Sequence, residues 1–356
     1  KIQAGEETAR AQALRRWDSL AKPLGSLGIL EEAIVRIAAL TGTAEVCLKN
    51  RALVVLCADN GVVSQGVSQS DASVTRAVTA ALGNQSSTVN YMAQKVNCQV
   101  VPVDLGVLDF LGAPGVKNCR VRNGTGDISQ GPAMTRAQCI QAIETGISLA
   151  QEAKETGASI LLTGEMGIGN TTTSCAVASV LLGRDPGQLA GRGSGLSEEG
   201  FRRKVRAIRQ AICRNAPDPG DPISVLQTVG GLDLAGLCGL CLGGAYVRLP
   251  VLLDGLIADV AALCAVRLRP QAADALLAGH VSAEPGAQWV LQALGLRGMI
   301  QAEMRLGEGT GAVAALPLLD LALAVYQSGH TFAQLGIDPC PQHRQGKGLG
   351  DVVVGA

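Results

Sequence analysis

The sequence predicts an α/β fold, with a doubly wound, mostly parallel sheet and a second, smaller helical domain. Four short apolar runs lack polar alternation and indicate strands covered on both faces: residues 52–58, 99–103, 158–162 and 249–253. Amphipathic stretches that predict helices lie between and after them, among them 133–155, 198–215 and 287–304. Strands that alternate with helices along a chain are typical of a parallel sheet with helices on both faces.

The two ends of the chain predict the smaller domain. Residues 6–40 have a helical pattern that a turn at 22–28 interrupts, and the chain beyond 271 again has a mostly helical pattern. We therefore expect a large α/β nucleotide-binding domain at 45–285. The smaller, mainly helical domain is expected to combine 1–44 with 286–356.

The composition excludes several classes of protein. The 356 residues include 30 Lys and Arg against 30 Asp and Glu, so no net charge favours nucleic acid or an anionic membrane as a partner. Aromatic residues make up only 2%, which leaves few rings on which bases would stack. The most apolar stretches, 249–268 and 313–326, contain aspartate or proline, so no membrane-spanning helix is expected.

The eleven cysteines are dispersed and lie mostly inside apolar runs. This pattern is typical of reduced, buried thiols, and it predicts a cytoplasmic protein. Cys238 and Cys241 have Cys-x-x-Cys spacing, but no second pair and no histidine is close in the sequence. We expect them to be small core residues rather than a metal or redox pair, and we expect no metal site.

A glycine-rich run at 163–174, TGEMGIGNTTTS, carries the clearest chemistry. It follows an apolar strand and precedes a helix of small residues, and free amides at such a helix N-terminus favour a phosphate. Glu165 lies in the same turn, and a carboxylate beside a phosphate site indicates a phosphorylated sugar. The run matches neither the P-loop, which needs a lysine, nor the dinucleotide motif Gly-x-Gly-x-x-Gly. A plain turn capped by Asn170 or a threonine is the alternative interpretation.

An acidic residue follows each of the four predicted strands: Asp59, Asp104, Glu165 and Asp254. The carboxyl ends of parallel strands face the ligand crevice of an open sheet, so the four together predict a polar pocket. Each aspartate taken alone is equally consistent with a helix N-cap.

Glu308 lies between glycines in the run 304–312, next to apolar residues. It is either a general base whose pKa burial raises toward neutrality, or part of a helix C-cap, and the residues alone do not choose. Lys204 belongs to a basic helix face, which either meets solvent or turns one member inward to a phosphate. His280 lies in a loop-like segment, 280–284, which we expect to line the cleft.

Taken together, these residues resemble the nicotinate-nucleotide:dimethylbenzimidazole phosphoribosyltransferase family over nearly the whole chain. The motifs that carry the resemblance are KPLGSLG at 22–28, CADNG at 57–61, GEMGIGNTT at 164–172, VGGLD at 229–233, LLDG at 252–255 and RLGEG at 305–309. The resemblance implies an enzyme that moves phosphoribose from nicotinate mononucleotide to the lower-ligand base of a cobamide, giving an α-riboside phosphate and nicotinate. It implies no cofactor.

The same resemblance assigns roles to individual residues. It makes Glu308 the catalytic base and places Glu165 at the ribose. The phosphoribose site that it implies comprises Glu165, Gly167, Gly169, Asn170, Thr171, Thr172, Lys204 and Ser282. The family is typically dimeric, which implies a homodimer, or a heterodimer with a homologous subunit.

The acceptor pocket implied by the family comprises Ser70, Val78, Met166 and Leu306. Members of the family often have a histidine where this chain has Asn60. They commonly have a glutamine where it has Val78 and a leucine where it has Met166. These differences predict a more apolar pocket, and some relatives activate phenol or p-cresol instead of a benzimidazole. We therefore expect a small aromatic acceptor that is either dimethylbenzimidazole or a phenol.

Two other functions compete with this one. A nucleotide-dependent oxidoreductase would need the dinucleotide motif, which is missing. A catalytically silent subunit of a heterodimer would be expected to lose Glu308 or the phosphate loop, and this chain has both.

Overall fold

The computed structural model describes residues 1–193 and 195–338, and contacts divide the chain into two units. Of the described residues, the larger unit combines Lys1–Ala4 with Leu48–Leu316, and the smaller combines Gly5–Cys47 with 317–338. Residues 286–316, which we expected in the smaller domain, thus belong to the larger unit. The part of that expectation that concerns 339–356 lies outside the described residues.

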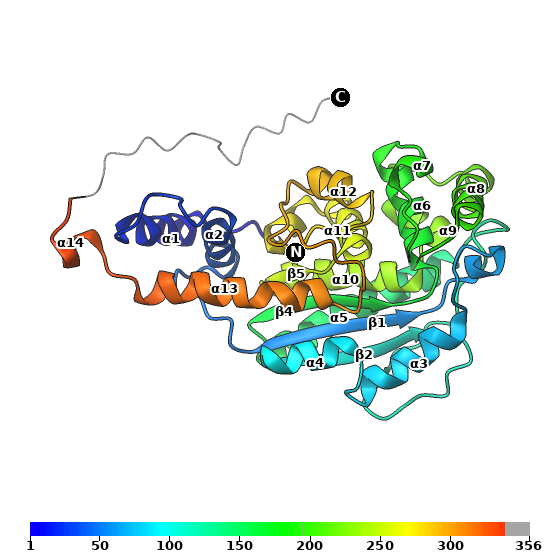
Figure 1. The fold of residues 1–356 in the computed structure, drawn as a ribbon, viewed down its shortest axis with the longest axis horizontal. Helices are drawn as coiled ribbons and strands as arrows, with labels where there is room; N and C mark the ends of the chain where they lie inside the picture. The colour runs from blue at the N-terminus through cyan, green and yellow to red at the C-terminus, as the bar shows by residue number, and fades with distance from the viewer. Residues whose placement is uncertain (194, 339–356) are drawn as a thin grey trace. The chain divides into compact units, whose positions relative to one another are not determined.

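A parallel sheet forms the centre of the larger unit (Figure 1). Its strands are β1 (Arg51–Ala58), β2 (Cys98–Gly106), β3 (Lys117–Asn118), β4 (Ile160–Met166), β5 (Val251–Leu253) and β6 (Leu276–Ala278). Their order is β3-β2-β1-β4-β5-β6, and every neighbouring pair is parallel. The chain winds outward from β1 in both directions, so the predicted doubly wound α/β fold is confirmed.

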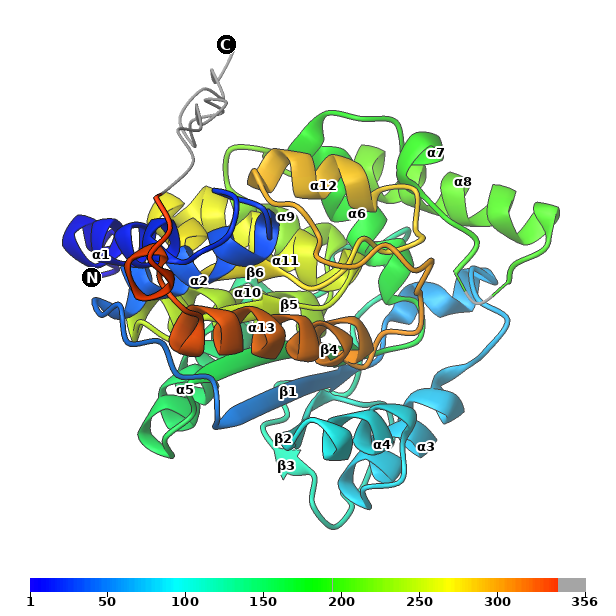
Figure 2. The ribbon, with the colours of Figure 1, turned by 60° about the vertical axis from the view of Figure 1, so that its left-hand side comes forward.

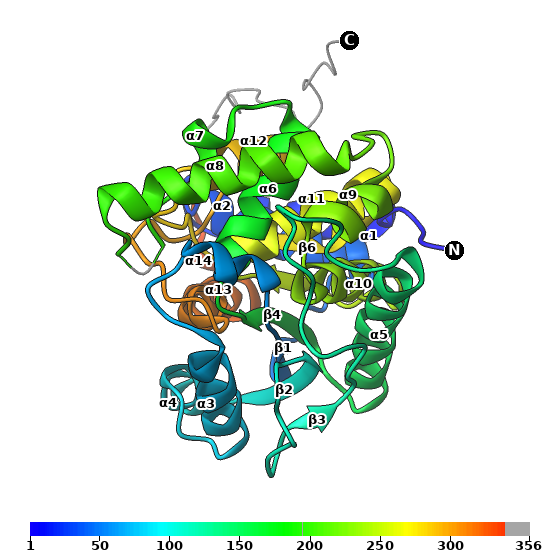
Figure 3. The same cartoon turned by 90° about the vertical axis from the view of Figure 1, so that its right-hand side faces the viewer.

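Helices cover both faces of this sheet. Figure 3 shows α3 and α4 on one side of the strands and α5 with α10 on the other. The helical elements of the larger unit are η1 (Gly61–Gln65), α3 (Ala72–Gly83), α4 (Thr88–Lys95), α5 (Arg136–Glu155), α6 (Asn170–Leu182), α7 (Pro186–Leu189), α8 (Glu198–Asn215), α9 (Pro222–Val229), α10 (Leu232–Tyr246), α11 (Leu256–Leu268), η2 (Pro270–Ala275) and α12 (Ala287–Leu294).

Small residues let α5 and α10 approach closely. A Cβ added at Gly239 would lie 1.9 Å from the carbonyl oxygen of Ile143, and one at Gly146 would lie 2.0 Å from that of Gly236. Cys238 and Cys241 of the same helix are fully buried free thiols, and burial raises the pKa of Cys241 to about 12. They are core residues, because a thiol that does not ionise is a poor metal ligand or nucleophile.

The smaller unit contains α1 (Glu7–Ser19), α2 (Ile29–Thr41), α14 (Phe332–Leu335) and the last part of α13 (Thr310–Ser328). Trp17 and Tyr326 join the two ends of the chain, with ring centroids 5.0 Å apart. The Tyr326 hydroxyl donates to the carbonyl of Ala44 at 2.9 Å, and Arg16 Nε donates to the carbonyl of Tyr326 at 2.8 Å. These contacts tie α1 and the last part of α13 into one unit.

Helix α13 is the one helix of the described residues that is long and apolar enough to cross a membrane by length and composition. It contains Pro317 and Asp320, and about 56% of its most apolar window is buried. A core helix passes the same test, so this is weak evidence for a membrane span.

Candidate active site

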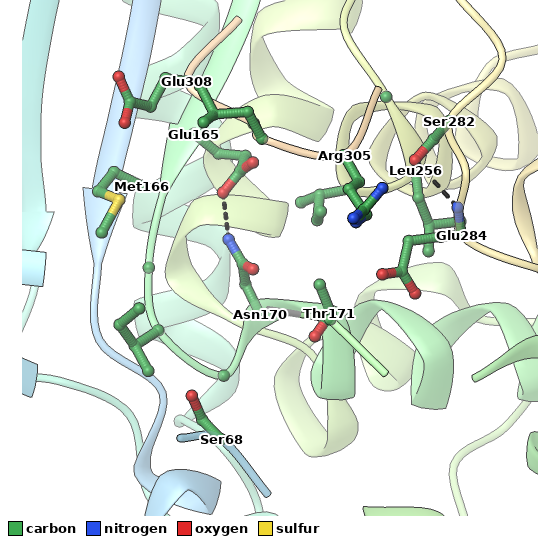
Figure 4. A pocket seen from close by; sticks show the side chains of 18 of the residues that line it. Ser68, Glu165, Met166, Asn170, Thr171, Leu256, Ser282, Glu284, Arg305 and Glu308 are labelled. Atoms are coloured by element: carbon green, nitrogen blue, oxygen red, sulfur yellow. Dashed lines mark hydrogen bonds between the residues drawn. The ribbon is translucent and has the colours of Figure 1, made fainter. Parts of the chain in front are cut away.

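A cavity of about 260 Å³ opens where β4 and β5 end (Figure 4). Figure 2 shows the carboxyl end of β1 running toward the same region as the loops before α6. The cavity walls come from segments that are far apart in the sequence: 67–78, 165–171, 192–193, 196–204, 254–258, 280–284 and 305–308. A site at the carboxyl ends of parallel strands is the position that the fold class favours for a ligand.

The loop between β4 and α6 forms one wall. Gly169 has φ of 93°, and a Cβ at this position would lie 2.7 Å from Val63, so only glycine fits. No side chain caps α6, and the amides of Gly169 and Thr171 have no acceptor among the described residues. The alternative of a plain turn capped by Asn170 or a threonine is therefore wrong. An uncapped helix N-terminus at a cavity favours an anion.

Lys204 of α8 brings a positive charge to this helix N-terminus. Its side chain is only 1% exposed, and its Nζ donates to Thr171 Oγ1 at 2.9 Å and to the carbonyl of Gly191 at 3.0 Å. Burial lowers the pKa of Lys204, while the carboxylate of Glu284 acts in the opposite direction. Of the two sequence interpretations, the inward-turned lysine is correct, because a buried ammonium needs such acceptors.

Glu165 lies at the end of β4, buried beside the loop. Its side chain accepts a hydrogen bond from the Asn170 amide, and its backbone carbonyl accepts one from the Glu308 amide at 3.2 Å. Burial raises the pKa of Glu165 well above its usual range, and the nearby carboxylates of Asp233 and Asp254 raise it further. A cationic ligand at this position would favour the ionised carboxylate.

Glu308 is held in a strained turn before α13. Its φ is 60°, and Gly307 and Gly309 on either side both have φ of 89°. A Cβ at Gly309 would lie 2.4 Å from Leu53, so close packing also requires glycine there. No helix precedes Glu308, which excludes the C-cap interpretation. Strain of this kind persists at positions where the surroundings enforce it.

Asp254, which follows β5, enforces this turn. Its carboxylate accepts hydrogen bonds from the backbone amides of Gly309, Gly311 and Ala312 at 3.0, 2.7 and 3.3 Å. The Glu308 side chain is free of these contacts, and its Oε2 is buried without a partner. Burial raises the pKa of Glu308, and the Val89 amide and Ser87 hydroxyl partly oppose the shift. A carboxylate with raised pKa and a free oxygen is suited to accept a proton.

Apolar side chains line the cavity on the side of Met166. They are Val67, Val74, Val78, Met166, Ile168 and Leu306. Leu306 is 56% exposed, so it lies at the open rim. This wall suits a flat apolar ring.

The structure brings together most of the residues that sequence reasoning selected. Those that line the cavity are Val78, Glu165, Met166, Gly167, Gly169, Asn170, Thr171, Lys204, Ser282, Leu306 and Glu308. Ser70 does not line it, and Ser68 takes this place. Thr172 is fully buried, with its amide donating to the carbonyl of Gly169.

Two of the four acidic residues at strand ends do not reach the cavity. Asp104 accepts from Arg120 at 2.9 Å and from the Val107 amide at 2.8 Å, and Asp59 accepts from the Leu108 amide at 2.7 Å. Both hold the loop that follows β2. Of the four acidic residues, Glu165 and Asp254 line the pocket. Asp59 and Asp104 are not helix N-caps but bind the backbone and Arg120 of the loop that follows β2.

Sequence reasoning did not select Glu284 or Arg305 individually as site residues, and both also line the cavity. Figure 4 places the Glu284 carboxylate and the Arg305 side chain across the cavity from the Asn170 side chain. A signal for Glu284 was present, because His280, Ser282 and Glu284 belong to one short loop-like segment that was expected near the cleft. All three line the cavity. Within residues 1–193 and 195–338, no group of His, Cys, Asp and Glu is arranged to hold a metal.

Comparison with known proteins first defines the class. The family model described as phosphoribosyltransferase matches residues 2–337. The chain is 47% identical over 327 residues to the nicotinate-nucleotide–dimethylbenzimidazole phosphoribosyltransferase of Ruminiclostridium cellulolyticum, covering 92% of this chain and 93% of the relative. It is 45% identical over 324 residues to the enzyme of that name from Acetivibrio thermocellus, covering 91% and 92%.

A solved structure gives the same result. The crystal structure of CobT from Thermus thermophilus matches with a TM-score of 0.88 and 41% identity, covering 93% of this chain and 99% of that one. The chain belongs to the nicotinate-nucleotide–dimethylbenzimidazole phosphoribosyltransferase family, as its motifs predicted.

Proposed function

We propose that this enzyme transfers phosphoribose from nicotinate mononucleotide to dimethylbenzimidazole, giving the α-riboside phosphate and nicotinate. The observation that carries the proposal is one cavity that has an uncapped helix N-terminus with Lys204 on one side and, on another, the Glu308 carboxylate, whose Oε2 has no hydrogen-bond partner. The helix N-terminus suits a phosphate, and the Glu308 carboxylate suits a group that gives up a proton. The relatives' names support the choice of substrates.

The phosphate of the donor would bind at the amides of Gly169 and Thr171, with Lys204 as its counter-charge and Ser282 beside it. Charge-assisted hydrogen bonds of this kind are the strong ones, at about 1.5–3 kcal/mol each. Thr172 supports the loop from inside α6. The ribose would then lie next to Glu165, between the phosphate site and the apolar wall.

The leaving nicotinate ring is a pyridinium, so it departs with the electron pair of its bond to C1′ and needs no proton. Positive charge develops on the ribose as this bond breaks. The carboxylate of Glu165 would stabilise that charge, because a fixed negative group in a dry site interacts strongly with it. A nitrogen of the acceptor forms the new bond to C1′ from the opposite side.

The acceptor must lose a proton as it attacks. Glu308 would take the proton from the other ring nitrogen, since its Oε2 is free and its pKa is raised. The Asp254 contacts hold the turn that presents this carboxylate. One base is sufficient for this reaction, so no histidine is needed at the reacting atoms.

A phenolic acceptor is the second candidate, and the apolar wall favours it. Val78 and Met166 line the acceptor side, and neither offers a hydrogen bond to a second ring nitrogen. A phenol presents one hydroxyl, which Glu308 alone can deprotonate. We therefore propose overlapping use of benzimidazoles and phenols rather than an exclusive choice.

We also propose a cytoplasmic enzyme that acts as a homodimer or as the active member of a heterodimer with a homologous subunit. The ten cysteines within the described residues are free thiols, which suits a reducing compartment. The exposed Leu306 at the cavity rim supports a second subunit that covers it. A silent subunit is not favoured, because Glu308 and the phosphate loop are both in place.

The test is direct incubation of the purified protein with nicotinate mononucleotide and dimethylbenzimidazole. Release of nicotinate and formation of the α-riboside phosphate, followed by chromatography, are the expected results. The same assay with a panel of phenols measures transfer to the second candidate, a phenolic acceptor. No transfer to any acceptor, with or without a co-expressed homologous subunit, would contradict the proposal.

A further inference from the structure

One fully buried carboxylate, Asp233, lies behind the site and does not line the cavity. It belongs to the first turn of α10 and is 0% exposed. Its Oδ1 accepts the Leu234 amide at 3.0 Å, and its Oδ2 accepts Asn170 Nδ2 at 3.2 Å. Of these two hydrogen bonds, only the one to Asn170 leads to a residue that lines the cavity.

The Asn170 side chain lies between two carboxylates. Its Nδ2 donates to Asp233 on one side and to Glu165 on the other, which uses both N–H groups of the amide. Both neighbours are acceptors, so only the amino end of the side chain fits between them. Figure 4 shows the Asn170 amide turned toward Glu165.

Without Asp233, the bond to Glu165 is the one hydrogen bond within the described residues that the Asn170 side-chain amide would keep, and a single bond does not fix the orientation of the amide. The side chain is 6% exposed and borders the cavity, so it has room to rotate away from Glu165. A hydrogen bond to a charged group that is left unmade is costly in a buried site. Glycine at 167 leaves the space for this arrangement, because a Cβ there would lie 3.0 Å from Asp233 Oδ2.

We propose that Asp233 is a positioning residue of this active site: it fixes the Asn170 amide, which in turn orients the Glu165 carboxylate toward the ribose. The inference rests on the proposed function, since it assigns a role within that reaction. Asp233 touches no substrate and takes no part in a proton transfer. The arrangement acts like other supporting contacts that hold a reactive group in its productive geometry.

Charge gives the proposal a second readout. The groups that act on Glu165 are Asp233, Asp254, Glu308 and the Asn170 amide, and Asp233 is the largest of the charged contributors. Burial raises the pKa of Asp233 itself to about 6. Removal of the Asp233 charge lowers the pKa of Glu165, and loss of the Asn170 hydrogen bond raises it by a smaller amount, so the acid limb of the activity profile should move to lower pH in the variant.

The experiment is a double-mutant cycle with Asp233→Asn, Asn170→Ala and the double variant. Asparagine at 233 keeps the shape but turns one of two acceptor oxygens into a donor, so Asn170 and the Leu234 amide cannot both be satisfied. Each single variant should lower kcat about tenfold with little change in KM for nicotinate mononucleotide. At a pH above the acid limb, where a change in the Glu165 pKa does not alter kcat, the double variant should match Asn170→Ala within about twofold, because the positioning effect of Asp233 acts through Asn170.

A matched control is Asp259→Asn, which changes another fully buried carboxylate, in α11, whose oxygens have no hydrogen-bond partner. It should leave kcat and the acid limb unchanged. If Asp233→Asn does not fold, Asn170→Ala tests the same contact from the cavity side. Activity of Asn170→Ala or Asp233→Asn within twofold of wild type, or effects that multiply in the double variant, would overturn the inference.

A crystal structure of Asp233→Asn separates this inference from the proposed function, since it needs no activity. The Asn170 side chain should be rotated away from Glu165. An unchanged Asn170 would overturn the positioning role even if the enzyme transfers phosphoribose as proposed. A wild-type enzyme without any transfer would refute the proposed function, whereas a rotated Asn170 would still support the contact described here.

Discussion

Lys204→Met tests whether the buried lysine recognises the phosphate of the donor. Methionine has a similar length, so the variant removes the ammonium while it keeps the packing of the stem. The wild-type Nζ makes hydrogen bonds of 2.9 and 3.0 Å to Thr171 Oγ1 and the Gly191 carbonyl, which position it at the helix N-terminus. Loss of one charge-assisted contact of about 1.5–3 kcal/mol should lower kcat/KM for nicotinate mononucleotide roughly ten- to hundredfold.

The same variant should change stability little. The pKa of Lys204 is lowered by burial, so the folded state disfavours the charged form. This penalty is complete at pH below the folded pKa and disappears above the unfolded value of 10.5, so the wild type carries it at pH 7. Methionine removes the penalty but leaves the Gly191 carbonyl unpaired, at a cost of about 1–3 kcal/mol. The two effects oppose each other, and we expect a small change in Tm.

The assay compares two donors, nicotinate mononucleotide and nicotinate riboside, which lacks the phosphate. Lys204→Met should lower kcat/KM for the first and leave the second within about twofold. Arg206→Met is the control, because it removes an exposed cation from the same helix. An equal loss for both donors would refute the reasoning and make Lys204 a structural residue.

Further expectations concern the base, the loop, the acceptor and stability. Glu308→Gln should keep nucleotide binding by calorimetry but lose a hundredfold or more in rate, on the order expected of a general base, and turnover within a few-fold of wild type would contradict its role. Gly169→Val should abolish nucleotide binding, because a Cβ there would lie 2.7 Å from Val63, and binding at wild-type affinity would exclude the loop as the phosphate site. Val78→Gln should raise the ratio of specificity constants for dimethylbenzimidazole over phenol by about tenfold, and an unchanged ratio would remove Val78 from the acceptor pocket. Burial raises the pKa of Asp233 from 3.8 to about 6, so its protonation stabilises the fold, and this contribution is present at low pH and lost as pH rises through 6. The free energy of unfolding measured by denaturant should therefore rise less between pH 7 and pH 4 in Asp233→Asn than in wild type, and equal slopes would contradict the raised pKa.

Local patterns in the sequence determined most of the fold. The four predicted strands are apolar runs that differ clearly from the polar segments around them. The strands β1, β2, β4 and β5 all overlap these runs. The missed strands, β3 and β6, have two and three residues, which is too short for a periodic signal. The helix predicted at 287–304 ends at Leu294, because Gly295 adopts φ of 64° and the following segment bridges to His280 instead.

The glycine-rich loop at 163–174 and the glycine-flanked Glu308 were also evident from the sequence alone, since glycine at a strained turn is a local requirement. What only the tertiary structure decided is which distant groups meet there. Nothing in the sequence around Lys204 distinguishes it from the exposed cations on the same helix, and only its place against α6 turns it inward. The contacts of Asp254 with the Glu308 turn, and of Asp233 with Asn170, join residues 55 and 63 positions apart. Such pairings depend on how the strands and helices pack, and a pattern that describes neighbours along the chain does not contain them.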